Sequence, residues 1–165
     1  MKRLLAGFVF VLGVHAVLFA QENAEQIEAV PVFQMRLVVE KNTPKAEPFL
    51  QKGTGEEIWL ASEIVLEDSD IVSIKKDRDR RTRQPIILIN FSDAGAVKLF
   101  DFTAAHIGDS AALIINGELV VVAKIVDTIP GGKLQVTGNF TNEEVTAIVS
   151  LFNDHKKRLL IDIFK

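Results

Sequence analysis

The sequence predicts an α+β fold in which two amphipathic helices pack on a mixed or antiparallel β-sheet. Three observations indicate this class. Short apolar segments rich in β-branched residues recur between turn residues, two segments begin with helix-capping residues, and an Asn-Gly pair separates two apolar segments. The sequence has no cysteine, so neither disulfides nor thiolate metal sites contribute to the fold.

The N-terminal residues predict an export signal. The basic start Met1-Lys2-Arg3 precedes an apolar stretch over residues 4–20, which contains His15. This stretch is at the short limit for crossing a hydrocarbon core of about 30 Å, and a histidine is unfavourable inside a true span. A cleaved signal peptide is therefore favoured over an uncleaved N-terminal membrane anchor. We expect the protein to be exported to the periplasm or the extracellular space.

Cleavage near Ala20 predicts a signal peptide over residues 1–20, a flexible leader over 21–31 and one folded domain over 32–165. Cleavage after Ala16 fits the small-residue rule better but shortens the apolar core. The domain that remains has about the commonest domain size, so it can bury a core without staples.

The mature chain is expected to be acidic. Of the 19 basic residues in the sequence, Lys2 and Arg3 are lost with the signal, which leaves 17 against 22 acidic residues and a net charge of −5. Proteins that bind nucleic acids need positive fields to displace counterions from phosphates. Together with export, this balance argues against a nucleic-acid partner.

The first part of the domain predicts one strand and a loop. Residues 32–40 alternate and are rich in strand-forming residues, which predicts the first strand. Residues 41–55 contain Pro44 and Pro48 among charged residues and glycines, which predicts a loop. Residues 58–66 fit neither the strand period nor the helical period, so a strand and a short helix both remain open.

Two further strands are expected at residues 71–74 and 85–91, joined by the charged segment 75–84. The second of these strands, PIILINF, is almost entirely apolar. Such a strand is expected at the centre of a sheet, covered on both faces.

The first helix is predicted to begin after Ser92, whose side chain can cap it, and to end at Gly108. Asp93 in the first turn complements the helix dipole. The helix face expected to pack on the sheet carries Val97, Phe100, Ala104 and Ile107.

A β-hairpin is predicted around Asn116-Gly117, because this pair tolerates the positive φ angles of a type I′ turn. Its two strands are expected at residues 111–115 and 118–125. Residues 134–136 predict another strand after the turn Pro130-Gly131-Gly132.

The second helix is predicted to begin with a capping box formed by Thr141 and Glu144. Its apolar face carries Val145, Ile148, Val149 and Phe152. Lys156, Lys157 and Arg158 are expected at its end, where the dipole favours positive charge. Residues 159–164 alternate weakly and could form a last edge strand.

A series of motifs follows in a specific order between residues 85 and 151. It comprises the strand PIILINFS, a helix with an internal Gly-Ala and a late threonine, the apolar Asn-Gly hairpin, a Gly-Gly pair, the sequence TGNFT and a Glu-Glu pair. In this order the motifs resemble the first periplasmic head domain of SecD, a subunit of the protein-export machinery. Weaker similarity reaches back to Val32. The resemblance implies a domain that engages exported polypeptides or the export machinery and that has no catalytic residues.

The sequence departs from this family in three respects, the last being that residues 153–156 (NDHK) replace the family's Gly-x-Leu-Pro exit after the last helix. SecD carries its head on a base domain followed by transmembrane helices, whereas no hydrophobic span follows the signal in this sequence, so a free-standing relative is expected. Where the family's hairpin often continues with Ala-Pro, this chain has Ala123-Lys124. A β-ladder can therefore continue without the interruption that proline imposes.

No catalytic, metal or cofactor site is predicted. His106 and His155 have no partner histidine at ligand spacing, so each is expected to be a surface histidine or a hydrogen-bonded one. The acidic segment 67–70 lacks the glycine and the distal glutamate of an EF-hand loop, and a solvated turn is expected there. No cofactor is expected.

Candidate binding residues fall into two sets. The charged segment has a local charge of +4, from six basic residues against Asp77 and Asp79, and can meet anionic lipid, lipopolysaccharide phosphates or an acidic partner unless it is only a solvated arm. Its basic residues are Lys75, Lys76, Arg78, Arg80, Arg81 and Arg83.

The hairpin, with which an extended polypeptide can pair, contributes Asn116, Gly117, Val121 and Ile125.

Two classes of function follow from these patterns. The first is a non-catalytic binding module of the cell envelope that engages exported polypeptides or the export machinery. The second is a structural or adaptor protein of the envelope with one folded partner or an anionic surface, since a fold alone does not determine a function. Both imply a polypeptide or protein partner, with membrane contact that is at most peripheral unless the N-terminal anchor is retained.

Overall fold

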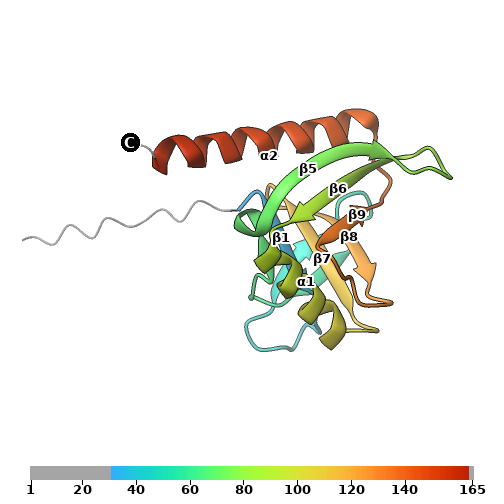
Figure 1. Cartoon of the computed structure of the whole chain (residues 1–165). Helices are drawn as coiled ribbons and strands as arrows, with labels where there is room; N and C mark the ends of the chain where they lie inside the picture. Colours follow the sequence, from blue (N-terminus) through green and yellow to red (C-terminus); the bar gives the residue numbers. More distant parts are fainter. Residues whose placement is uncertain (1–30, 164–165) are drawn as a thin grey trace, which may run out of the picture.

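The computed structural model describes residues 31–163, so the predicted signal peptide and the leader up to residue 30 lie outside the described residues. Within this range the structure has nine β-strands, two α-helices and one short 3-10 helix, which confirms the α+β class (Figure 1). The strands are β1 (Phe33–Leu37), β2 (Glu47–Leu50), β3 (Glu57–Leu60), β4 (Leu66–Glu67), β5 (Ile71–Arg78), β6 (Pro85–Phe91), β7 (Ser110–Ile115), β8 (Glu118–Lys124) and β9 (Lys133–Val136). The helices are η1 (Asp68–Asp70), α1 (Asp93–Ala105) and α2 (Asn142–Ile163).

The strands form three sheets in which all paired strands are antiparallel. The strand orders are β4-β1-β7-β8, β2-β3 and β5-β6-β9. The predicted central strand is confirmed, because β6 lies between β5 and β9 and most of its side chains are buried. The strand before it is longer than predicted, since β5 extends through the charged residues to Arg78.

The predicted hairpin is confirmed. β7 and β8 are joined by Asn116 and Gly117, whose φ angles of 51° and 79° are both positive, as a type I′ turn requires. The register of this pair shifts between Leu113 and Ile114, which indicates a β-bulge.

The loop predicted over residues 41–55 is interrupted by a strand. β2 pairs with β3 in a two-stranded sheet whose register places Pro48 opposite Trp59. Proline is tolerated there because β2 is an edge strand. This hairpin packs on the four-stranded sheet through a small buried cluster of Leu60, Ala112, Ile114 and Leu119.

The main core lies between the four-stranded sheet, the three-stranded sheet and both α-helices. Its fully buried side chains include Phe33 of β1, Ile87 of β6, Leu99 of α1 and Phe152 of α2. β1, β6, α1 and α2 therefore each contribute at least one large apolar group to the main core.

The start of α1 is as predicted, because the hydroxyl of Ser92 accepts a hydrogen bond from the N–H of Gly95 at 3.1 Å. The predicted buried face is wrong. Val97 is 59% exposed and Phe100 is 44% exposed, whereas Leu99 and Phe102 are buried.

The observed face of α1 is determined by a close backbone contact. A Cβ atom placed on Gly95 would lie 2.6 Å from the carbonyl oxygen of Asp70, so only glycine allows the helix to approach η1 this closely. Leu99, Phe102 and Thr103 follow on the same side of the helix and are buried.

The second helix begins with the predicted capping box. The Thr141 hydroxyl accepts from the N–H of Glu144 at 3.1 Å, and the Glu144 carboxylate accepts from the N–H of Thr141 at 2.9 Å. The bond from the Thr141 N–H to the carboxylate is the main reason that the pKa of Glu144 is lowered. Val145 and Phe152 are buried on the predicted face, and Ile148 and Val149 pack partly buried beside them.

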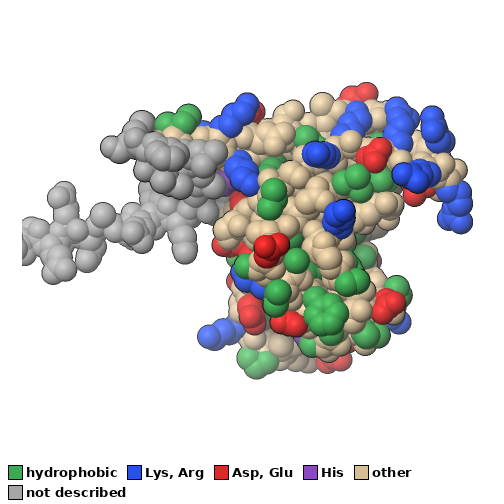
Figure 2. Space-filling model, viewed as in Figure 1, with side chains coloured by type: hydrophobic (Ala, Val, Ile, Leu, Met, Phe, Trp, Pro, Cys, Tyr) green, Lys and Arg blue, Asp and Glu red, His purple; other side chains and the backbone are tan. Residues whose placement is uncertain are grey.

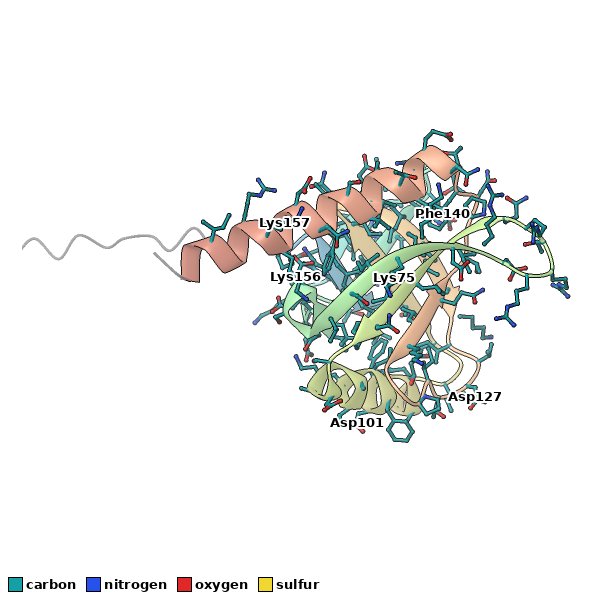
Figure 3. All side chains as sticks on the ribbon, turned by 45° about the horizontal axis from the view of Figure 1, so that its top comes forward. Lys75, Asp101, Asp127, Phe140, Lys156 and Lys157 are labelled. Atoms are coloured by element: carbon teal, nitrogen blue, oxygen red, sulfur yellow. The ribbon has the colours of Figure 1, made fainter. Side chains whose placement is uncertain are left out.

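The edge strand predicted over residues 159–164 is wrong, because α2 continues to Ile163. Lys156 holds this part of α2 against the sheet. It lies on the side of α2 that faces β5 (Figure 3), and its ammonium group donates to the carbonyl oxygens of Ile71 and Val72 at 2.7 and 2.9 Å. Within residues 31–163, neither helix is both long and apolar enough to cross a bilayer.

Candidate functional site

The predicted binding residues lie in three places. Asn116 and Gly117 form the exposed turn of the β7–β8 hairpin, and Val121 and Ile125 lie at its other end. The six basic residues lie on the hairpin that joins β5 to β6. The structure thus brings Val121 and Ile125 together and places them apart from the other candidates.

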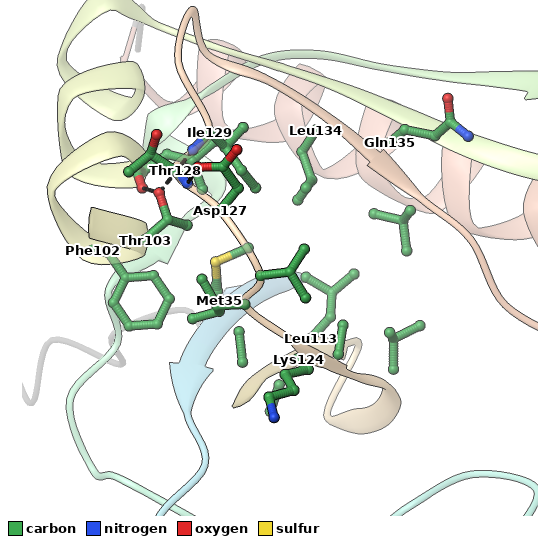
Figure 4. A pocket seen from close by; sticks show the side chains of 18 of the residues that line it. Met35, Phe102, Thr103, Leu113, Lys124, Asp127, Thr128, Ile129, Leu134 and Gln135 are labelled. Carbon is green, nitrogen blue, oxygen red and sulfur yellow. Dashed lines mark hydrogen bonds between the residues drawn. The ribbon is translucent and has the colours of Figure 1, made fainter. Parts of the chain in front are cut away.

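An apolar cavity of about 260 Å³ adjoins Val121 and Ile125 (Figure 4). We call it the β8–β9 groove, because its walls come from the C-terminal half of β8, the loop after it and β9, with α1 and β1 behind them. The larger apolar side chains of the lining include Met35, Leu99, Phe102, Leu113, Val121, Ile125, Ile129, Leu134 and Val136. The volume is below the range of about 300–1,000 Å³ that is typical of small-molecule sites, and it suits one or two side chains.

The polar atoms inside the groove are satisfied. The hydroxyl of Thr103 donates to the carbonyl oxygen of Leu99 at 2.8 Å and accepts from the N–H of Ile129 at 3.0 Å. Lys124, Asp127 and Gln135 border the groove and are exposed. The interior therefore favours an apolar group, because the hydroxyl of Thr103 is already bonded and the exposed polar residues lie at the margin.

Both strands beside the groove are sheet edges. Among the described residues, β8 pairs with β7 and has one further bridge, between Leu119 and Gln51, whereas β9 pairs only with β6. The bridge lies at the start of β8, so the part of its edge next to the groove carries no partner strand in the described part of the chain. An edge of this kind can accept an additional strand.

The hydrogen bonds at the C-terminal end of β8 show in which direction its backbone N–H and C=O groups point. The N–H of Ile125 donates to the carbonyl oxygen of Asp109, and its own carbonyl accepts from the N–H of Gly108, so Ile125 faces β7. Backbone groups alternate in an antiparallel strand, which directs those of Lys124 and Val122 to the free edge. The side chains of Val121, Ala123 and Ile125 meanwhile line the groove.

The acidic segment 67–70 is not the solvated turn that was predicted. Asp68 and Asp70 are 9% and 4% exposed in the 3-10 helix η1. Asp68 accepts from the N–H groups of Val32 and Phe33 at 2.6 and 2.7 Å. These acids are therefore part of the scaffold and are not available as a cation site.

His155 also contacts this buried acid, with its Nε2 atom 3.2 Å from Oδ2 of Asp68. Burial raises the pKa of Asp68, while the N–H groups of Val32 and Phe33 and the charge of His155 act in the opposite direction. His106 contacts Asp109 at 3.0 Å. Among residues 31–163 no group of three or more His, Asp or Glu side chains gathers to hold a metal ion.

Most residues of the groove were not predicted from the sequence. Met35, Phe102, Ile129 and Leu134 come from four separate segments, and only the fold brings them together. One signal was present: Leu134 and Val136 alternate with polar residues, which indicates a half-buried strand with one apolar face.

Comparison with known proteins gives one family. The family described as SecDF, P1 head subdomain, matches residues 43–154. The protein translocase subunit SecD of Acidaminococcus fermentans is 29% identical over 87 residues, which cover 53% of this chain and 21% of that protein. SecD of Rhodobacter capsulatus is 34% identical over 67 residues, which cover 41% of this chain and 12% of that protein. The chain thus spans about a fifth or less of the length of these curated relatives.

Two solved structures share the fold. One is the crystal structure of SecDF in its super-membrane-facing form, with a TM-score of 0.59 and 18% identity over 74% of this chain and 18% of that chain. The other is a structure of SecDF, described as a membrane component that enhances protein export, with a TM-score of 0.59 and 19% identity over 74% of this chain and 61% of that chain. Because the sequence identities are only 18% and 19%, these similarities show a shared fold and nothing more.

Proposed function

This chain belongs to the family of SecDF P1 head domains, and on that premise we propose that it is a non-catalytic module of the cell envelope that binds extended segments of exported polypeptides. The relation to the export machinery comes from the family. The β8–β9 groove supports this binding mode, and we propose that the module acts in the periplasm.

The proposal rests on an apolar cavity that lies directly beside a part of a sheet edge with no partner strand among residues 31–163. A polypeptide that pairs with β8 continues the same sheet, so its alternate side chains point to the face on which Val121, Ala123 and Ile125 line the groove. Main-chain hydrogen bonds are the same for every sequence, and the groove adds a preference for apolar side chains. Binding of this kind is weak and broad, which suits chains that share a backbone but no sequence.

Lys124 offers a direct test of strand addition. Lys124→Pro removes the N–H that points to the free edge and leaves the hydrogen bonds between Ile125 and residues 108–109 in place. Affinity for an unfolded, signal-less export client should fall at least about fivefold, because one backbone hydrogen bond of about 1 kcal/mol is lost and the proline ring obstructs the incoming strand. The matched control is Lys124→Ala, which removes the charge but keeps the N–H.

The titrations are carried out at low and at high salt. Client binding that persists at high salt, weakens in Lys124→Pro and is retained in Lys124→Ala supports the proposal. Binding that is lost equally in both variants, or that disappears at high salt, would show that charge rather than the sheet edge holds the client. Absence of client binding under every condition would leave the adaptor function with one folded partner.

A further inference from the structure

The proposed binding of polypeptides does not use the most strongly charged feature of the molecule. Residues 75–84 form the outer half of β5 and the turn into β6, and we call this segment the basic arm. It extends from the body beyond the start of α2 (Figure 1), and Lys and Arg side chains gather around it (Figure 2).

The root of the arm is fixed to the body. Lys76 donates from its ammonium group to the carbonyl oxygen of Asn142 at 3.1 Å and to the hydroxyl of Thr146 at 2.9 Å. Arg78 donates to the side chain of Asn142 at 3.3 Å. Two of the six basic side chains therefore hold the arm against the first turn of α2.

The turn at the tip of the arm is built by Asp79. Its Oδ1 atom accepts from the N–H of Arg81 at 3.0 Å and from the N–H and hydroxyl of Thr82 at 2.7 and 3.0 Å. The N–H of Arg83 donates to the carbonyl oxygen of Asp79 at 2.8 Å. The bonds from Thr82 are the main reason that the pKa of Asp79 is lowered.

The remaining positive charges of the arm have no acidic partner in the described part of the chain. Arg80, Arg81 and Arg83 are exposed, and no ion pair among residues 31–163 includes any of the six basic residues of the arm. The only acid at the tip is Asp79, whose carboxylate is already engaged by the turn. A hydrogen-bonded turn thus presents three guanidinium groups outward.

We propose that the basic arm docks the protein on an anionic membrane surface, with the guanidinium groups of Arg80, Arg81 and Arg83 bound to lipid phosphates. Guanidinium groups bind phosphate oxygens bidentately, and clusters of basic residues attract anionic bilayers by charge alone. The tip, residues 79–84, has no apolar side chain. Stable protein interfaces usually centre on buried apolar and aromatic side chains, which the tip lacks, so its composition favours a lipid surface over an acidic protein.

The test compares two triple variants with the same change in net charge. In the first, Arg80, Arg81 and Arg83 become Gln. In the control, Lys41, Lys45 and Lys157 become Gln; these lysines are exposed and lie outside the arm. Lys45 and Arg83 are matched in backbone conformation, with φ angles of 61° and 63°. Melting temperatures of all forms should agree, because none of the six side chains is in the core.

Protein recovered from the envelope fraction of an expressing bacterium is titrated with two kinds of vesicle. One is pure phosphatidylcholine, and the other is an equimolar mixture of phosphatidylcholine and phosphatidylglycerol. The readout is the ratio of the two affinities, in which any contribution common to both vesicles cancels. Each basic residue near an anionic surface strengthens binding about fivefold, so the ratio should fall about 100-fold in the arm variant and stay near that of the wild type in the control.

The same ratio should decrease when salt is raised from about 0.15 M to about 1 M, since the screening length falls from about 8 Å to about 3 Å. Equal losses in the arm variant and the control would overturn the proposal, as would a wild-type ratio near one. Stronger binding to soluble polyglutamate than to the anionic vesicles would also overturn it, and would identify an acidic protein as the partner of the arm.

Discussion

Oδ2 of Asp68 lies 3.2 Å from Nε2 of His155, so the turn after β4 and the C-terminal helix are joined by a buried pair. The same carboxylate accepts hydrogen bonds from the N–H groups of Val32 and Phe33 at the start of β1. One side chain therefore connects three segments that are far apart in the sequence, and its loss should be felt by all of them.

The first prediction concerns this carboxylate. Asp68→Asn keeps one acceptor oxygen but turns an NH₂ group toward a backbone N–H or toward His155. It should lower the free energy of unfolding by about 2 kcal/mol, because a buried donor is left without an acceptor. Chemical denaturation measures this cost. The control is Asp154→Asn on the exposed side of α2, where the nearest cation, Lys157, is 4.0 Å away, and a change within about 0.5 kcal/mol is expected. Equal effects of the two variants would contradict the buried pair.

The second prediction concerns pH. Burial raises the pKa of Asp68 above its ordinary value of 3.8, and the hydrogen bonds of the arm turn lower that of Asp79. The contribution of Asp68 to the free energy of unfolding is therefore complete below 3.8 and is lost as pH rises through its folded-state pKa. The contribution of Asp79 to the free energy of unfolding is present above pH 3.8 and is lost as the pH falls through its folded-state pKa. Carboxyl carbon NMR titration should give midpoints on opposite sides of 3.8, and the reverse order would refute this assignment.

The third prediction separates two neighbouring aromatic residues of α1. Phe102 is 7% exposed and contributes to the main core, whereas Phe100 is 44% exposed. Phe102→Ala should cost about 3–5 kcal/mol, while Phe100→Ala should cost about 1 kcal/mol or less. Thermal and chemical unfolding of both variants measure the difference. A larger cost for Phe100→Ala would mean that the predicted face, not the observed one, packs on the core.

The fourth prediction concerns the approach of α1 to η1. Alanine normally stabilises a helix relative to glycine by about 1 kcal/mol. At Gly95 the opposite is expected, with a loss of about 1–3 kcal/mol, because the new methyl group would meet the carbonyl oxygen of Asp70 at 2.6 Å. An unfolding curve for Gly95→Ala that is unchanged or shifted to higher stability would show that the two elements can separate freely.

Features with a local cause could be predicted from the sequence. The turn at Asn116-Gly117 and the capping box of Thr141 and Glu144 both follow from residues within four positions of one another. Local backbone preference and local hydrogen bonds determine such features before any tertiary contact forms. The central position of β6 was predictable for a related reason, since an unbroken apolar strand has to be covered on both faces.

Features with a distant cause could not be predicted in the same way. Apolar residues lie on several sides of α1, so periodicity favoured the wrong face, and the close approach of Gly95 to Asp70 determines the observed one. The C-terminal part of α2 is held to β5 by Lys156, whose hydrogen-bond partners Val72 and Ile71 lie 84 and 85 positions away in the sequence. The strand β2 was missed because its partner lies beyond a turn and because Pro48 argued for a loop.

The candidate site was predictable in part. Val121 and Ile125 were selected because they lie on a hairpin that can accept another strand, and the structure places both beside an apolar cavity. The walls formed by α1, β1 and β9 depend on packing between distant segments. The separation of this groove from the basic arm is likewise a property of the fold.

Amide hydrogen exchange of β8, with and without a saturating extended client peptide, distinguishes strand addition from other modes of binding. The N–H groups of Val122 and Lys124 point to the free edge, whereas that of Ile125 is already bonded to Asp109. Strand addition predicts that bound peptide slows exchange at Val122 and Lys124 and leaves Ile125 nearly unchanged. Saturable peptide binding with unchanged exchange at Val122 and Lys124, or with slowing confined to the basic arm, would show that the peptide does not add to the edge of β8.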